Sequence, residues 1–345
     1  MKLRVICRIV GLYTRLNVVC VGSVLVLALS GCSAIQVKMG LRVSLAKIPV
    51  ASIEASLPNN PGIAPGEKSP LVVAVTGSDG KVLLTEGKGK GKVLWKDLTV
   101  TATVVSANKK GVLSLPKDPR VSDGKTGHVT ITVPTHPGIQ TDLDIPLRYN
   151  YNFVSSYAGA SGFNGANGTD GIDGTSGSPG SMDPNNPSAG GNGSNGTNGT
   201  DGSNGGDGGD GPSVQVRVTL RPGSQSGSQP LLQVGVLSAG HKERFYLVDP
   251  QGGSLAVNSN GGAAGTGGKG GRGGRGGSGG IGTPNGSNGS DGSSGQDGRA
   301  GSDGRGGSIT VTYDPQVKTL LTLIHLNNQG GPAPVFREDS VPPLW

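Results

Sequence analysis

Cysteine is scarce in this chain, and its few copies are confined to the N-terminus. The 345 residues contain three cysteines, and none of them follows Cys32. The chain beyond that residue cannot form an internal disulfide, so other interactions must hold its fold. The apolar run at 16–29 is too short and wrongly flanked for an ordinary membrane-spanning helix.

Residue patterns that carry catalysis or bind metals are also missing. The four histidines are scattered without metal-ligand or catalytic-triad spacing: His128, His136, His241 and His325. The sequence has no phosphate-binding loop that ends in Lys-Ser or Lys-Thr. We therefore expect a protein that is not an enzyme and that has no metal and no cofactor.

The first 32 residues have the pattern of an export signal. Four cations and no acid stand at its start: Lys2, Arg4, Arg8 and Arg15. The apolar run ends in Leu29, Ser30, Gly31 and Cys32, which resembles the lipobox of bacterial lipoproteins. The resemblance implies a signal peptide at 1–31 and acylation of Cys32. Because Ser33 is not Asp, it also implies delivery to the outer membrane, on the periplasmic face or the cell surface. The alternative is an uncleaved anchor with a chance cysteine.

The net charge is small once the signal peptide is removed. The full chain has a formal charge of +7, from 30 Lys and Arg against 23 Asp and Glu. Loss of the four cations in residues 1–31 leaves +3, which is too little to indicate nucleic acid binding. The expected partner is the membrane, through the lipid on Cys32. The basic segment of Lys88, Lys90 and Lys92 is either a contact for anionic envelope polymers or a solvated hairpin tip.

Residues 48–157 have the composition of a β domain. β-branched content and alternation predict strands at 71–75, 98–104, 129–133 and 147–153. Ser78 to Lys81 has the composition of a hairpin turn. The segment from Ile53 to Val75 resembles the opening of bacterial immunoglobulin-like repeats, and Gly127 to Val133 resembles their closing strand. The resemblance implies a β-sandwich and says nothing about chemistry.

From residue 158 the chain is built on glycine at every third position. Glycine keeps this period in four runs: run 1 at 159–180, run 2 at 190–211, run 3 at 262–280 and run 4 at 286–307. Run 3 contains seven in-phase glycines and each of the others contains eight. Runs of matched length, joined in pairs by turns with Pro and Asn, predict rods about 60–70 Å long at roughly 3.1 Å per residue.

Three interpretations of the glycine runs compete. Gly-X-Y periodicity resembles bacterial collagen-like proteins, but Pro179 is the single proline inside the runs, and collagen typically needs at least about 15–20%. A second resemblance, to glycine-rich antifreeze and phage-tip proteins, implies a bundle of polyglycine-II helices. In such a bundle an all-glycine ridge lets neighbouring backbones satisfy their N–H and C=O groups. The third interpretation is a flexible region. Matched run lengths favour the bundle, because a flexible linker needs no register.

The charges of the runs predict how they pack. Runs 1 and 2, with the turn between them, contain six aspartates and no Lys or Arg. Lys269, Arg272 and Arg275 are three residues apart in run 3 and form one cationic ridge, while the other two ridges of this run are almost entirely glycine. We therefore expect run 3 to occupy the most crowded position and to pack against runs 1 and 2. Each exposed charge pair would add only about 0–1 kcal/mol.

Together these features predict a mainly β chain with almost no α-helix outside the signal peptide. Strands are also expected at 214–220, 231–237, 244–248, 255–257, 309–313 and 320–326, where they cap the glycine bundle and supply its apolar core. The predicted order is signal peptide 1–31, lipidated linker 32–47, β-sandwich 48–157, glycine pair 158–211, β insert 212–258, glycine pair 259–307, closing strands 308–326 and an extended Pro-rich tail 327–345.

The function predicted from this plan is that of a lipid-anchored envelope protein with a structural or adhesive role. The rods would be presented to matrix polysaccharide or to other copies of the chain. The alternative is a binding module that recognises a repetitive ligand, polysaccharide or ice, along the polar Ser, Thr and Asn ridges.

Overall fold

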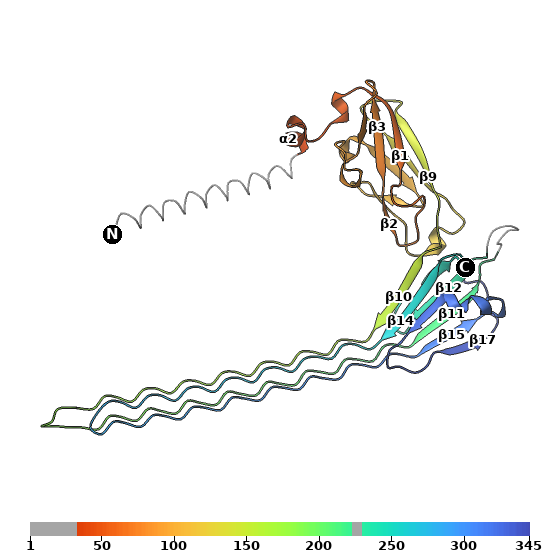
Figure 1. Ribbon diagram of the computed structural model, residues 1–345. Coiled ribbons are helices and arrows are strands. Elements are labelled where there is room, and N and C mark those ends of the chain that lie inside the picture. The colour runs from red at the N-terminus through yellow and green to blue at the C-terminus, as the bar shows by residue number, and fades with distance from the viewer. Residues whose placement is uncertain (1–32, 223–229) are drawn as a thin grey trace. The chain divides into compact units, whose positions relative to one another are not determined.

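The computed structural model describes residues 33–222 and 230–345 of a chain that is mainly β (Figure 1). The chain divides into two compact units, Met1–Tyr149 and Asn150–Trp345. The predicted signal peptide, including Leu29, Ser30 and Gly31, lies outside the described residues, as does Cys32. Among the described residues, no helix has the length and apolar character needed to span a membrane.

The N-terminal unit contains three antiparallel sheets of three strands each, which follow a short helix, α2 (Ser33–Lys38). The strands of the three sheets, in order of pairing, are β1 (Val50–Ser56), β3 (Val72–Gly77) and β4 (Val82–Leu84); β2 (Lys68–Pro70), β7 (Val112–Ser114) and β6 (Ser106–Ala107); and β5 (Thr99–Thr103), β8 (Gly127–Thr132) and β9 (Gln140–Ile145). One 3-10 helix, η1 (Leu45–Lys47), precedes β1, and three more lie between the strands: η2 (Gly87–Gly89), η3 (Trp95–Asp97) and η4 (Pro119–Val121).

One cluster of buried apolar side chains forms the core of this unit. Burial alternates along β8, so that Val129 and Ile131 are fully buried while His128, Thr130 and Thr132 are half-buried. The strands predicted at 71–75, 98–104 and 129–133 are confirmed as β3, β5 and β8. Gly80, with φ +76°, lies in the predicted turn between β3 and β4. The immunoglobulin-like sandwich stays a prediction.

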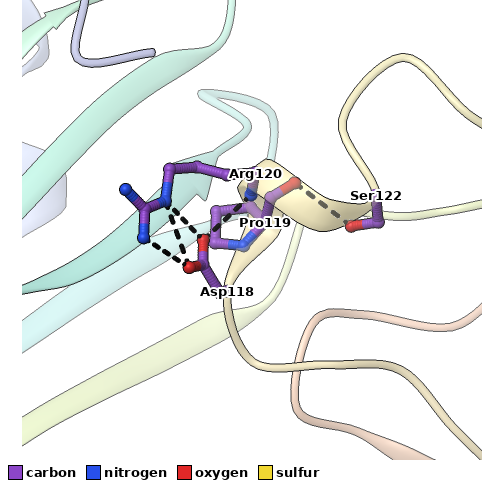
Figure 2. Close-up of polar contacts among 4 residues, drawn as sticks. All are labelled: Asp118, Pro119, Arg120 and Ser122. Carbon is purple, nitrogen blue, oxygen red and sulfur yellow. Dashed lines mark hydrogen bonds and ion pairs between the residues drawn. The ribbon is translucent and has the colours of Figure 1, made fainter.

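Local polar contacts fix the short helix η4 (Figure 2). The Asp118 carboxylate accepts two hydrogen bonds from Arg120, one from its main-chain N–H at 3.0 Å and one from its Nη2 at 2.7 Å. The Ser122 hydroxyl donates to the Pro119 carbonyl at 3.3 Å. The hydrogen bond from the Arg120 side chain is the main reason why the pKa of Asp118 is lowered.

The C-terminal unit contains two sheets, from which the glycine runs project (Figure 1). The smaller is parallel and pairs β10 (Asn152–Ala158), β14 (Ser254–Asn260) and β16 (Ile324–Asn327). The larger contains, in order of pairing, β13 (Arg244–Val248), β12 (Leu232–Ser238), β11 (Val214–Leu220), β15 (Ile309–Tyr313) and β17 (Val335–Glu338). A second apolar cluster joins Phe153 and Leu255 of the smaller sheet to Val216 and Val311 of the larger.

Three features of this unit differ from the predicted plan. The strand predicted at 147–153 lies instead at 152–158, as β10, and it pairs with β14. The first unit therefore ends at Tyr149 rather than at residue 157, because the composition changes only where the glycine begins, after that strand. Residues 320–323 end a 3-10 helix, η5 (Pro315–Leu323), because Asp314 and Pro315 start a helix there. The tail 327–345, predicted as extended chain, is extended at β17, but this strand also joins the larger sheet by pairing with β15, which was not predicted.

Candidate functional site

Each glycine run is joined to a strand of the C-terminal unit. Run 1 follows β10 and run 3 follows β14, whereas run 2 leads into β11 and run 4 into β15. The four runs lie side by side and project from the sheets as a narrow bundle (Figure 1). At its far end the two turns meet, where the Thr283 N–H donates to the Ser188 carbonyl at 2.9 Å.

Main-chain hydrogen bonds join five pairs of runs. Six or seven N–H···O=C bonds of 2.7–2.9 Å connect run 1 to run 3, run 1 to run 2, run 2 to run 4, run 2 to run 3, and run 3 to run 4. Runs 2 and 3 are therefore central, and runs 1 and 4 lie on either side of them. Runs 1 and 3 are parallel, as are runs 2 and 4. The expectation that run 3 packs against runs 1 and 2 is confirmed, while the polyglycine-II conformation of each run stays a prediction.

Glycine is required in the runs because the backbones approach closely, not because of φ. No glycine of the four runs, all of which are described, has a positive φ. A Cβ on Gly268 would lie 1.9 Å from the Ala166 carbonyl oxygen, and one on Gly270 would lie 2.1 Å from that of Gly295. Real Cβ atoms essentially never come within 3.0 Å of another heavy atom. Run 3 has two glycine ridges because one faces runs 1 and 2 and the other faces run 4.

The Asn and Asp residues that precede in-phase glycines have a role that the sequence analysis missed. In run 2, the Asn198 Oδ1 accepts the N–H of Ser293 at 2.8 Å, and Gly199 donates its own N–H to the Ser293 carbonyl at 2.9 Å. One Asn-Gly pair thus binds both main-chain groups of one residue in run 4. The same pairing recurs at Asn192, Asn195, Asp201, Asn204, Asp207 and Asp210 in run 2. It also joins run 1 to run 3 at Asn164, Asn167, Asp170 and Asp173.

Serine and threonine of run 2 bind run 1 in an equivalent way. The Thr200 N–H donates to the Thr169 carbonyl at 2.9 Å, and the Thr200 hydroxyl oxygen accepts the Thr169 N–H at 2.7 Å. Ser194, Thr197 and Ser203 repeat this pairing. Each Gly-Ser/Thr-Asn/Asp triplet of run 2 therefore uses glycine to fit run 3, the hydroxyl residue to bind run 1, and the Asn or Asp to bind run 4. The fixed order of residue types within the triplet indicates that each ridge has one role, but it does not show which run each ridge binds.

The register of the runs continues that of the strands. β10 pairs with β14 so that Ala158 lies opposite Asn260, and run 1 side chains bond to run 3 at the same separation of 102 residues. β11 pairs with β15 so that Val214 lies opposite Ile309, and run 2 side chains bond to run 4 at the same separation of 95 residues. The two sheets therefore align the runs at the base of the bundle.

The cationic ridge of Lys269, Arg272 and Arg275 lies where run 3 meets run 1. The charged side chains of this ridge were expected to pair with the aspartates of run 1, but those aspartates bond to the backbone instead. Asp170 uses its carboxylate to accept the main-chain N–H of Arg272 at 2.7 Å, and Asp173 does the same for Arg275. The Lys269 Nζ pairs with Asp297 of run 4 at 2.7 Å; this contact raises the pKa of Lys269 and lowers that of Asp297. The aspartates of run 1 thus act as hydrogen-bond acceptors for the backbone.

Runs 1 and 2 together present a surface without charged side chains, which we call the uncharged side. It consists of two adjacent ridges of exposed residues: Phe163, Ala166, Thr169, Ile172 and Thr175 of run 1, and Ser194, Thr197, Thr200 and Ser203 of run 2. The Phe163 ring packs over Gly206, where a Cβ would lie 2.5 Å from it. The side chains of Phe163 and Ile172 remain 71% and 75% exposed.

Outside the bundle, one histidine of the N-terminal unit is paired with two carboxylates. His128, on β8, bonds Asp144 at 2.7 Å and lies 3.3 Å from Asp142, and the hydrogen bond to Asp144 is the main reason why its pKa is raised. In residues 33–222 and 230–345, no group of three or more His, Cys, Asp and Glu side chains is placed to hold a metal ion.

Comparison with protein-family models and with curated proteins returns no match for this chain. The class that the structure itself defines is a mainly β protein whose C-terminal unit carries a four-run glycine bundle held by main-chain hydrogen bonds.

Proposed function

We propose that this protein is a lipid-anchored, non-enzymatic component of the cell envelope that presents the glycine bundle as a structural or adhesive element. The observation that carries the proposal is the lateral bonding of the four runs over their whole length. Such bonding turns segments without an apolar core into a stiff projection, about 60–70 Å long at roughly 3.1 Å per residue. The non-glycine side chains, which also bond neighbouring runs, stay exposed and are presented to matrix polysaccharide or to another copy of the chain.

The anchor in this proposal is Cys32, with residues 1–31 as a signal peptide and the outer membrane as the destination. Support comes from the cationic start of the chain and from the lipobox of Leu29, Ser30 and Gly31. Labelled palmitate should be incorporated into the full chain and should be lost in Cys32→Ser. Incorporation that persists in this variant would refute anchoring at Cys32. Protease treatment of intact cells would distinguish the cell surface from the periplasmic face.

A second candidate function is recognition of a repetitive ligand, such as polysaccharide or ice, by the uncharged side. The observation that favours it is the pair of adjacent ridges of small and hydroxyl residues. Residues on one ridge recur every three positions, which corresponds to about 9 Å along the bundle. Two exposed apolar residues, Phe163 and Ile172, interrupt this array without forming side-chain hydrogen bonds.

Two sets of variants separate the candidates. Removal of one Gly-X-Y triplet from each run, at matching levels, preserves the lateral register and shortens the projection by about 9 Å. If the bundle acts as a structural projection, adhesion of cells to a polysaccharide-coated surface should weaken each time one triplet is removed from all four runs. Direct recognition predicts that Phe163→Lys with Ile172→Lys abolishes retention of the full chain on polysaccharide, while the control pair Ser290→Lys and Ser293→Lys on run 4 leaves retention unchanged. Adhesion that is insensitive to both sets would refute both functions.

A further inference from the structure

Two segments that meet shortly after the predicted lipidation site carry exposed lysines. Lys38 ends helix α2, and the loop that contains η2 supplies Lys88, Lys90 and Lys92, all of them exposed. We call these four lysines, together with Met39 and Leu41, the anchor patch. Met39 and Leu41 are 56% and 51% exposed, so the patch combines cations with apolar side chains.

Several contacts hold the lysine loop against the start of the N-terminal unit. The Val43 N–H donates to the Lys92 carbonyl at 2.8 Å, and the Lys92 Nζ donates to the Gly40 carbonyl at 3.2 Å. The Arg42 guanidinium pairs with Glu86 at 3.1 Å. These contacts place the end of the lysine loop against residues 40–43, which follow α2 and lie about fifty residues earlier in the sequence.

Acidic residues are scarce on this surface. The first acid after Cys32 is Glu54, and Glu86 is the single acid between residues 80 and 96. Glu86 is already engaged by Arg42 and by the main-chain N–H of Trp95. Among the described residues, Lys38, Lys88 and Lys90 form no ion pair, so their charges are available to an external anion.

We propose that the anchor patch lies on an anionic phospholipid surface and gives the lipoprotein a second attachment to the membrane. The proposal rests on anchoring through Cys32. Helix α2 has six residues, which span about 9 Å at 1.5 Å per residue. Lys38 and Met39 therefore follow the acylated residue within about one Debye length, roughly 8–10 Å at physiological salt. At that distance headgroup charges attract lysines, and exposed apolar side chains can enter the interface.

Vesicle binding of the unacylated mature chain, residues 32–345 with Cys32→Ser, tests the patch without the lipid. The chain should sediment with vesicles of equal parts phosphatidylglycerol and phosphatidylcholine, should not sediment with phosphatidylcholine alone, and should be released by salt. Lys88→Gln with Lys90→Asn should weaken binding by about 25-fold, at roughly fivefold per lysine. Asn suits position 90 because Lys90 has φ 52°.

The matched control removes two exposed lysines from another part of the same unit, Lys68→Gln with Lys117→Gln, and should leave binding unchanged. Absence of binding, equal binding to neutral vesicles, or an equal loss in the control pair would overturn the proposal. Tighter binding to soluble alginate than to the vesicles would also overturn it, in favour of an envelope polymer. Palmitate labelling tests Cys32 independently, so failure of the patch and failure of the anchor are distinguishable.

Discussion

A methyl group added to the centre of the bundle tests whether close backbone approach holds the runs together. In Gly271→Ala the new Cβ would lie 1.9 Å from the Thr169 carbonyl oxygen, so runs 1 and 3 must separate by about 1 Å to reach the 3.0 Å limit. The flanking bonds from Gly168 and Gly171 to run 3, now 2.7 Å long, would then leave hydrogen-bonding range. The bond from the Gly271 N–H to the Thr200 carbonyl would be weakened as well. Loss of three hydrogen bonds at about 0.5–1.5 kcal/mol each should lower the local stability of the bundle by about 3 kcal/mol.

Hydrogen exchange at the glycine amides measures this loss directly. A loss of about 3 kcal/mol should accelerate local exchange by about 100-fold. Gly209→Ala is the control, because its Cβ would lie 3.2 Å from the nearest atom, the Ala160 nitrogen, and it changes the unfolded chain in the same way. Equal exchange in the two variants would refute the steric reasoning. Random-coil exchange in the unaltered chain would refute the bundle itself.

Other contacts lead to different expectations. Asp170→Asn should keep the glycine amides protected from hydrogen exchange, since an amide oxygen can also accept the Arg272 N–H. Asp170→Ala should accelerate local exchange severalfold. Equal acceleration in the two variants would show that the charge of Asp170, and not only its acceptor oxygen, stabilises the bundle. Deletion of residues 340–345 should destabilise the C-terminal unit by about 1–3 kcal/mol in thermal melts, because buried Gln233 loses the Leu344 N–H that it accepts at 2.9 Å. His128 should titrate by NMR above its ordinary pKa of 6.5. Its stabilising contribution should be complete below pH 6.5 and be lost as the pH rises through the raised value, and His128→Asn should remove this dependence.

The general arrangement of the glycine runs could be predicted because it depends on what the residues lack. A backbone can approach another wherever side chains are missing, and the two glycine ridges of run 3 marked it as a central run. Strands such as β8 and β11 were predictable for a related reason, since their alternation reflects one buried face.

The side-chain roles within the runs were not predictable in the same way. Asn198 acts on Ser293, which lies 95 residues further along the chain, so its role depends on a register that no local pattern reveals. The aspartates of run 1 were expected to pair with the cationic ridge, yet Asp170 bonds to the backbone of that ridge. Composition locates a charge, but it does not distinguish a counter-ion from a hydrogen-bond acceptor. Residues 320–323 were assigned to a strand because a short apolar run suits either a strand or a helix.

The closely matched lengths of the runs follow from a register that is fixed at both ends of the bundle. At the base, the pairing of β10 with β14 and of β11 with β15 sets the offsets between parallel runs. At the far end, the two turns set the antiparallel register of run 1 with run 2 and of run 3 with run 4. Any three of these four registers determine the fourth, because the runs form a closed set of neighbours. A triplet gained or lost by one run would keep its glycines in phase, but it would leave three residues without partners in the neighbouring runs and would shift the turn or the strand at its end out of register. The bundle can change length only when all four runs change together, at the same level.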